Sequence, residues 1–132
     1  MKIVVTSGYF DPLHVGHLEC LELAKQLGDK LIVIVNSDLQ AKLKKGKSFM
    51  NEQDRMKIIL ALKCVDEVFL SIDKDKTQCE SLRHLKPTIF AKGGDRTSTE
   101  IPEAKVCNEL GVDIVDSLGA KIRSSSDYTG LK

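Results

Sequence analysis

Short apolar runs alternate with longer amphipathic segments along the chain. Residues 3–6 and 31–35 are mostly aliphatic and β-branched, and they lack the polar alternation of a half-exposed strand. Such runs are typical of strands that are buried on both faces of a parallel sheet. Three further short strands are predicted at 67–70, 88–91 and 112–115, so the pattern indicates five strands.

Apolar residues at helical spacing predict four helices, at 15–27, 52–63, 76–85 and 103–110. Asn51 is expected to cap the second helix, and Gly28 and Gly111 stand where C-cap glycines belong. The lysine-rich segment 42–47 is expected to be a loop. Residues 124–126 are expected to cap a final half-turn of helix.

Strands that alternate with helices favour a parallel sheet wrapped on both faces, with right-handed crossovers. The predicted fold class is therefore α/β: a doubly wound, Rossmann-like sheet of five parallel strands with helices on both faces. The chain has 132 residues, without an internal repeat or a linker-like stretch. A single domain, residues 1–132, is the simplest organisation.

Composition narrows the classes of partner. The chain has 20 Lys and Arg against 19 Asp and Glu, a net charge of +1, which gives no electrostatic footprint for duplex nucleic acid. Four scattered cysteines, without a CxxC pair, fit neither a zinc site nor a disulfide scaffold and favour reduced thiols. No apolar run is long enough for a signal peptide or a membrane span, so we expect a cytoplasmic protein.

Candidate chemistry gathers in the segments that follow predicted strands. In an open parallel sheet, ligands bind beyond the carboxyl ends of the strands, where the winding reverses. Unusual segments stand at four such ends: SGYFDPLHVGHLE at 7–19, NSD at 36–38, KGGDR at 92–96 and KIRSSS at 121–126. Four such loops at one edge of one sheet indicate a site more strongly than any one of them.

Two histidines stand at the start of the first predicted helix. The i,i+3 relation of His14 and His17 puts both side chains on one face, and Gly16 lets another group approach the backbone. A helix N-terminus is suited to phosphate, so we expect both imidazoles to donate hydrogen bonds to phosphoryl oxygens. A zinc site lacks further ligands, because His84 is the only other histidine. A purely structural histidine pair is the alternative.

These residues carry a resemblance to a known family. The stretch GYFDPLHVGH resembles the signature of the cytidylyltransferase-like nucleotidyltransferases. The resemblance extends along most of the chain, since LELAKQLGDKLIVIVNSD is similar to glycerol-3-phosphate cytidylyltransferase and to the adenylyltransferase domain of ADP-heptose synthase. NEQDRMKIILALKCVDEV, with Arg55, resembles the family's next block, and FAKGGD looks more like the heptose-phosphate enzymes.

The resemblance implies roles for particular residues. His14 and His17 would be catalytic through stabilisation of charge on the α-phosphate, and Lys44 or Lys45 would reach the triphosphate; a solvated charge run is the alternative for the lysines. The nucleotide-binding residues would be Gly8, Tyr9, Phe10, His14, Gly16, His17, Lys45, Arg55, Gly93, Gly94, Asp95, Arg123, Ser124, Ser125 and Ser126. The acceptor-binding residues would be Asp11, Asp38 and Lys92.

The sequence departs from the family pattern near its end. IRSSS at 122–126 matches only part of the R-T-x-G-I-S-T-T-type motif, because no arginine stands five residues before the serines; Lys121 or Arg123 would substitute. A surface ion pair is the alternative for Arg55, and a plain turn for Gly93-Gly94-Asp95. Mg²⁺ is expected with the nucleoside triphosphate, held by phosphates and waters rather than by a site that the protein builds.

The predicted function is transfer of a nucleoside monophosphate from a triphosphate to a sugar or polyol phosphate, such as heptose 1-phosphate, with release of pyrophosphate. AMP transfer is favoured by KGGD alone, and a cytidylyltransferase that makes a CDP-polyol or CDP-aminoalcohol is the alternative. A catalytically silent nucleotide-binding module is an alternative of another class. Members of the family are often homodimers, so we expect a homodimer, and we expect neither a nucleic-acid nor a membrane partner.

Overall fold

The computed structural model describes residues 1–10, 13–93 and 102–118. Within these ranges one sheet contains five strands: β1 (Ile3–Gly8), β2 (Lys30–Val35), β3 (Glu67–Leu70), β4 (Ile89–Gly93) and β5 (Asp113–Leu118). Their order is β3-β2-β1-β4-β5, and every pairing is parallel. The winding therefore reverses between β1 and β4. The predicted α/β, Rossmann-like fold class is confirmed.

Successive residues of the central strands enter two separate cores. Val4 of β1 packs in one core together with Leu31 and Val33 of β2. Val5 packs in the other core together with Ile32 and Ile34. These strands are apolar on both faces because a layer of helices covers each face of the sheet.

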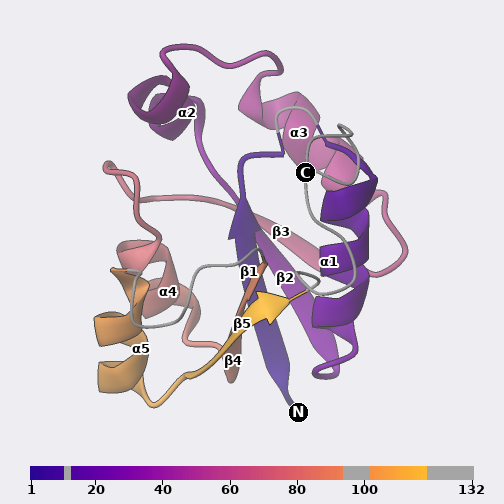
Figure 1. Cartoon of the computed structure of the whole chain (residues 1–132), viewed down its shortest axis with the longest axis vertical. Coiled ribbons are helices and arrows are strands. Elements are labelled where there is room, and N and C mark those ends of the chain that lie inside the picture. Colours follow the sequence, from indigo (N-terminus) through magenta and orange to yellow (C-terminus); the bar gives the residue numbers. More distant parts are fainter. Residues whose placement is uncertain (11–12, 94–101, 119–132) are drawn as a thin grey trace, which may run out of the picture.

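The two helix layers are divided evenly. Helices α1 (Val15–Lys25) and α3 (Glu52–Leu60) cover one face, and α4 (Cys79–Leu85) and α5 (Glu103–Leu110) cover the other (Figure 1). Leu21 of α1 and Ile59 of α3 complete the first core, whereas Leu82 and Val106 complete the second. Because each helix of a βαβ unit starts near the carboxyl end of a strand, α1 and α5 begin at the same edge of the sheet but on opposite faces.

Two predicted features of the first helix are wrong. The helix ends at Lys25, and its C-cap is Gln26, whose backbone is right-handed (φ −66°, ψ −15°). Gly28 is required for another reason, because a Cβ there would lie 2.8 Å from the carbonyl oxygen of Lys2. The other two cap predictions are confirmed: Gly111 ends α5 at φ 72°, and the Asn51 side chain accepts the Asp54 N–H at 2.8 Å.

The lysine-rich segment that was expected to be a loop is largely helical. Helix α2 (Asp38–Lys45) begins with a capping box, in which the Ser37 hydroxyl accepts the Gln40 N–H at 3.2 Å and the Gln40 side chain accepts the Ser37 N–H at 3.0 Å. Gly46 ends the helix at φ 86°. The capping interactions at both ends therefore stabilise this helix, although the apolar pattern of the segment does not indicate one. Figure 1 shows α2 beyond the carboxyl ends of the strands.

The remaining boundaries differ by a few residues. The helix predicted at 76–85 begins at Cys79, the one predicted to reach residue 63 ends at Leu60, and the fifth strand spans Asp113–Leu118. The half-turn predicted at 124–126 lies outside the described residues. Across the described ranges, no helix combines the length and apolar character that a bilayer crossing requires.

Candidate active site

The connection from β1 to α1 brings two imidazoles into a stack. His14 is the N-cap of α1, and its Nδ1 accepts the Gly16 N–H at 3.1 Å. The Nδ1 of His17 accepts the His14 N–H at 3.2 Å. The two ring centroids are 3.9 Å apart, with 25° between the ring planes. The histidines therefore satisfy backbone groups at the start of the helix in addition to any chemistry.

These contacts decide which ring nitrogen carries the proton. A neutral imidazole has one donor and one acceptor nitrogen, so an Nδ1 that accepts a backbone N–H leaves the proton on Nε2. Burial and, to a smaller extent, the charge of the neighbouring His14 lower the pKa of His17 to about 4. His17 is therefore neutral near pH 7, and it offers an Nε2–H donor rather than a positive charge.

Phe10 packs against the ring of His17. The Phe10 ring is buried and meets the His17 ring edge-on, with 5.2 Å between centroids. Its backbone lies in the left-handed region, at φ 52°, where an L side chain is strained. The same ring lies over Gly8, because a Cβ on Gly8 would come 2.7 Å from the Phe10 Cζ. Gly8 and Phe10 thus act on the site through packing.

Helix α2 carries a lysine to the end of β1. The Nζ of Lys44 lies 4.5 Å from the centroid of the Tyr9 ring, within the range of a cation–π interaction. Burial raises the pKa of the Tyr9 phenol; a hydrogen bond with the Asn36 side chain opposes this, and the charge of Glu103 adds to it. The structure thus brings Lys44 beside the loop that holds the histidines. It does not describe the side chain of Lys45.

Arg55 is buried, and its hydrogen bonds hold the segments that follow β1 and β2. Its side chain is 0% exposed, and its Nη1 donates to the carbonyl oxygens of Tyr9 at 2.8 Å and Asn36 at 2.7 Å. Nη2 pairs with Asp38 at 2.7 Å, and Nε donates to the carbonyl of Met50 at 2.9 Å. The expected alternative, a surface ion pair, is wrong because the guanidinium is enclosed. Direct contact with a phosphate stays a prediction that these four contacts do not favour.

The comparisons with known proteins identify the family. The family model described as Cytidylyltransferase-like matches residues 5–128. The chain belongs to this family. The resemblance predicted from the sequence is confirmed, and membership identifies a nucleotidyltransferase domain.

Relatives in the cytidylyltransferase-like family include larger proteins. The chain is 40% identical over 131 residues to the bifunctional protein HldE of Pelobacter propionicus, covering 98% of this chain and 25% of the relative. The corresponding protein of Syntrophotalea carbinolica is 42% identical over 122 residues, which is 91% of this chain and 23% of the relative. The chain therefore spans about a quarter of the curated relatives it matches.

Two solved structures share the fold. The lipopolysaccharide core biosynthesis protein of Thermoplasma volcanium has a TM-score of 0.76 at 31% identity, covering 88% of this chain and 95% of that one. The bifunctional NMN adenylyltransferase/ADP ribose pyrophosphatase of Francisella tularensis has a TM-score of 0.60 at 19% identity, covering 87% and 37%. At that identity, the second likeness concerns the fold alone.

The other residues expected from the family pattern fall into two groups. Asp38, Lys92 and Gly93 lie at the same carboxyl edge: Asp38 at the start of α2, and Lys92 and Gly93 at the end of β4. Asp38 is already engaged by Arg55, and its own N–H donates to Glu52 at 2.8 Å. The second group lies outside the described residues: Asp11, Gly94, Asp95, Lys121, Arg123, Ser124, Ser125 and Ser126.

Four polar residues at this edge escaped the sequence analysis. Asn36 and Gln40 are almost fully buried, and Asn36 contacts the Tyr9 phenol. Gln78 and Glu103 are 4% and 5% exposed, and the Glu103 Oε2 accepts the Gln78 N–H at 2.8 Å. Asn36 was singled out only as part of the NSD segment, in which Asp38 alone was given a role. Gln78 and Glu103 carry no local signal, because only the fold brings them together.

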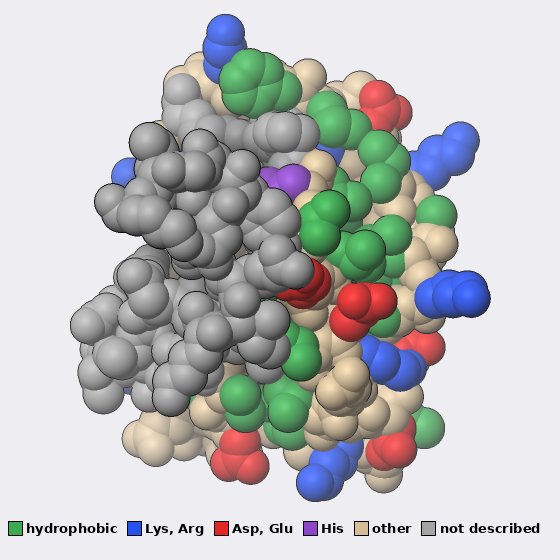
Figure 2. All heavy atoms as spheres, turned by 45° about the vertical axis from the view of Figure 1, so that its right-hand side comes forward, with side chains coloured by type: hydrophobic (Ala, Val, Ile, Leu, Met, Phe, Trp, Pro, Cys, Tyr) green, Lys and Arg blue, Asp and Glu red, His purple; other side chains and the backbone are tan. Residues whose placement is uncertain are grey.

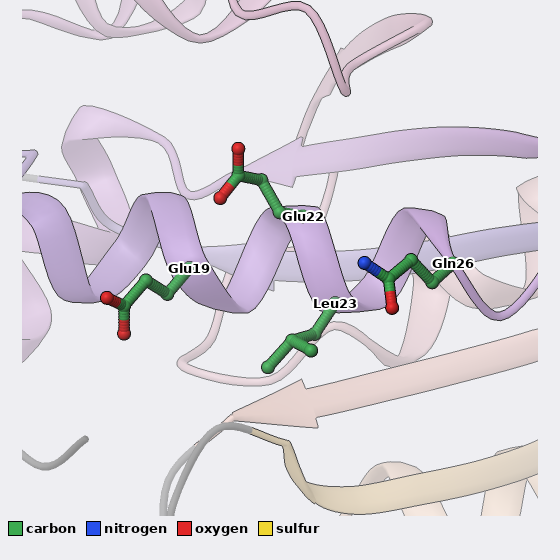
Figure 3. A pocket seen from close by; sticks show the side chains of 4 residues that line it. All are labelled: Glu19, Glu22, Leu23 and Gln26. Carbon is green, nitrogen blue, oxygen red and sulfur yellow. The ribbon is translucent and has the colours of Figure 1, made fainter. Parts of the chain in front are cut away.

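Elsewhere on the surface, a shallow hollow follows α1. Figure 3 shows that it is lined by Glu19, Glu22, Leu23 and Gln26, from the middle and end of that helix rather than its histidine-bearing start. Figure 2 shows a small area of histidine surface with apolar and acidic side chains beside it on this face. Over the described part of the chain, no three His, Cys, Asp or Glu side chains form a metal-binding group.

Proposed function

We propose that this chain transfers a nucleoside monophosphate, with AMP favoured, from a triphosphate to a phosphorylated sugar or polyol and releases pyrophosphate. The observation that carries the proposal is the histidine pair at the N-terminus of α1, whose Nδ1 atoms are occupied by backbone N–H groups. Both Nε2–H groups are then donors, which suits them to the oxygens of a phosphate group.

The proposed reaction requires little proton transfer. An oxygen of the acceptor phosphate attacks the α-phosphorus, the bond to the bridging oxygen of the β-phosphate breaks, and pyrophosphate leaves. The acceptor phosphate is already an anion, so the protein's task is orientation and stabilisation of charge. His14 and His17 donate to oxygens of the reacting phosphate, and the Lys44 ammonium neutralises the leaving pyrophosphate.

We propose that Mg²⁺ enters with the triphosphate. Phosphate oxygens and water are ordinary ligands for Mg²⁺, and no metal-binding group of protein side chains occurs in the described ranges. When bound, the ion would share with Lys44 the neutralisation of charge on the phosphates. The chain's own donors hold the α-phosphate and its leaving group in either case.

The nature of the acceptor is inferred from a sequence resemblance and from one structural likeness. The resemblance of FAKGGD to the heptose-phosphate enzymes and the likeness to a lipopolysaccharide core biosynthesis protein favour adenylyl transfer to a sugar phosphate. A cytidylyltransferase that makes a CDP-polyol is the second candidate, because the family signature itself does not distinguish the two bases. Three further expectations stay predictions: that the protein forms a homodimer, that it is cytoplasmic, and that it has no nucleic-acid partner.

The test is pyrophosphate release with Mg²⁺ from ATP, CTP, GTP and UTP, each paired with a panel of sugar, polyol and aminoalcohol phosphates. We expect release with ATP and a sugar phosphate. His17→Ala should reduce this turnover about a hundredfold, because one hydrogen-bond donor to the transition state is lost. Urea unfolding of the variant controls for the fold.

Other outcomes would redirect the proposal. Release with CTP alone would select the cytidylyltransferase. Nucleotide binding without release from any pair would favour the silent binding module. Undiminished turnover in a folded His17→Ala protein would contradict the proposed role of the histidine pair.

A further inference from the structure

The carboxyl edge of the sheet presents two different environments on its two faces. On the face covered by α1, the histidine pair has its Nδ1 atoms matched to backbone donors. On the face covered by α4 and α5, Gln78 and Glu103 lie side by side, joined by the bond between the Gln78 N–H and the Glu103 Oε2. The winding reverses between β1 and β4, the position at which open parallel sheets bind their ligands.

The Gln78 side chain has an acceptor without a donor. Its Oε1 is buried and receives no hydrogen bond from any described residue. Gln78 is the N-cap residue of α4, but its side chain makes no capping hydrogen bond, so the usual reason for a polar side chain at this position is absent. A buried carbonyl oxygen without a partner is rare in proteins and indicates a water or a ligand group.

Glu103 places a carboxylate next to the same segment. The residue is 5% exposed, and its Oε2 accepts the N–H of Gln78. Its charge acts on the phenol of Tyr9, the residue on whose ring Lys44 lies. Glu103 is thus connected through Tyr9 to the segment between the end of β1 and the histidines.

The backbone around Gln78 is held on several sides. Gln40 of α2 donates from its Nε2 to the carbonyls of Asp75 at 2.8 Å and Thr77 at 2.9 Å, just before Gln78. The carbonyl of Gln78 accepts the Leu82 N–H at 2.9 Å. The Oε1 therefore projects from a braced segment, which is what a binding group requires.

We infer that Gln78 and Glu103 recognise a hydroxyl group of the phosphorylated acceptor, so that the triphosphate lies on the α1 side of the sheet edge and the sugar or polyol on the α4 and α5 side. The inference rests on the proposed function and adds the residues that select the acceptor. The Gln78 Oε1 requires a donor, the neighbouring Glu103 carboxylate accepts hydrogen bonds as well, and the hydroxyls of a sugar are donors. An ammonium group is the competing donor.

The test separates binding of the acceptor from binding of the nucleotide. Gln78→Met removes the acceptor oxygen and keeps the length of the side chain, and Gln53→Met, at an exposed position of α3, is the matched control. The measurements are the KM of each substrate by pyrophosphate release, with glucose 1-phosphate, mannose 1-phosphate, glycerol 3-phosphate and ethanolamine phosphate as acceptors. Thermal unfolding and calorimetric binding of the same phosphates complete the set.

We expect Gln78→Met to raise the KM of the sugar phosphate about tenfold, as loss of one hydrogen bond implies, with the KM of the triphosphate and the unfolding temperature unchanged. Glu103→Gln should raise the same KM less, because an amide oxygen still accepts. An unchanged acceptor KM in Gln78→Met would mean that the oxygen binds only water, and it would overturn the inference while the proposed function stands.

Two further outcomes would also overturn the inference. Preference for ethanolamine phosphate, abolished by Glu103→Gln, would assign the site to an ammonium group. If no pair releases pyrophosphate, the proposed function fails and calorimetry decides this inference separately. Sugar phosphate that binds wild type more tightly than Gln78→Met would support it, and a lack of binding to wild type would contradict it.

Discussion

Two cations flank the end of β1, and they are held in opposite ways. Arg55 is enclosed, and three of its nitrogens are engaged by four protein oxygens. Lys44 is exposed, and its ammonium rests on the face of an aromatic ring. The contacts of Arg55 are directional and buried, so they fix a geometry, whereas a cation over a ring can leave without stranding a hydrogen bond. The comparison separates a charge that is part of the folded frame from one that we propose contacts the substrate.

The largest effect on stability is expected from removal of the buried cation, Arg55. Arg55→Met should lower the free energy of unfolding by about 3 kcal/mol, because the oxygens it satisfies lose their buried donors. Urea denaturation measures this, with Arg83→Met as the control, since Arg83 forms an exposed ion pair with Glu80 at 3.2 Å. The control should change stability by only about 0.5 kcal/mol. If both variants lost the same free energy of unfolding, the buried contacts of Arg55 would not be what stabilises the ends of β1 and β2.

Removal of the exposed cation, Lys44, should weaken substrate binding and leave stability nearly unchanged. Lys44→Ala should leave the unfolding temperature nearly unchanged and raise the KM of the triphosphate roughly tenfold, because a charge-assisted contact to the phosphates is lost. Binding of the nucleoside monophosphate should weaken less, since it lacks the β- and γ-phosphates. Steady-state kinetics and calorimetry measure both, with Lys57→Ala of α3 as the control. Equal losses for the two nucleotides would contradict contact with the triphosphate.

The last prediction concerns His17, which is not a cation near pH 7. The folded pKa of His17, about 4, lies below its ordinary value of 6.5, so the unfolded chain binds more protons between these values. Stability on account of His17 is therefore full above about pH 6.5 and is lost as the pH falls toward 4. His17→Ala should flatten this part of the curve of stability against pH, measured by urea unfolding at half-unit intervals.

The control for the pH effect is a histidine in another environment. His84 lies on α4 and stacks on Phe69, with 5.3 Å between ring centroids. His84→Asn, which also removes an imidazole, is measured over the same pH range. An unchanged slope in His17→Ala would show that His17 is not held neutral by the fold.

Where the sequence predicted well, the signal was local. The strands at 3–6 and 31–35 are continuous apolar runs because both of their faces are covered, and this pattern survives in the sequence without knowledge of the partners. His14 and His17 were found because their spacing at a helix start is itself the signal. Gly28 was assigned the wrong reason, because its close approach to the Lys2 carbonyl joins segments that are distant along the chain.

Most of the misses depend on tertiary contacts. The position of Arg55 on a polar helix gave no sign that its guanidinium would reach the ends of β1 and β2. Gln78 and Glu103 stand 25 residues apart and meet only when α4 and α5 pack together. Helix α2 was a different kind of miss, since its Ser37–Gln40 capping box and Gly46 were present in the sequence and were outweighed by the weak apolar pattern.

Three of the four contacts of Arg55 go to main-chain carbonyls, those of Tyr9, Asn36 and Met50. Every amino acid carries that group, so the brace does not depend on which side chains stand at these positions. The loops at the mouth of the site can therefore change their side chains during evolution, or by design, while the frame that aligns them is retained. A library that randomises residues 9 and 50, while it keeps Arg55 and the buried Asn36, should therefore yield folded proteins.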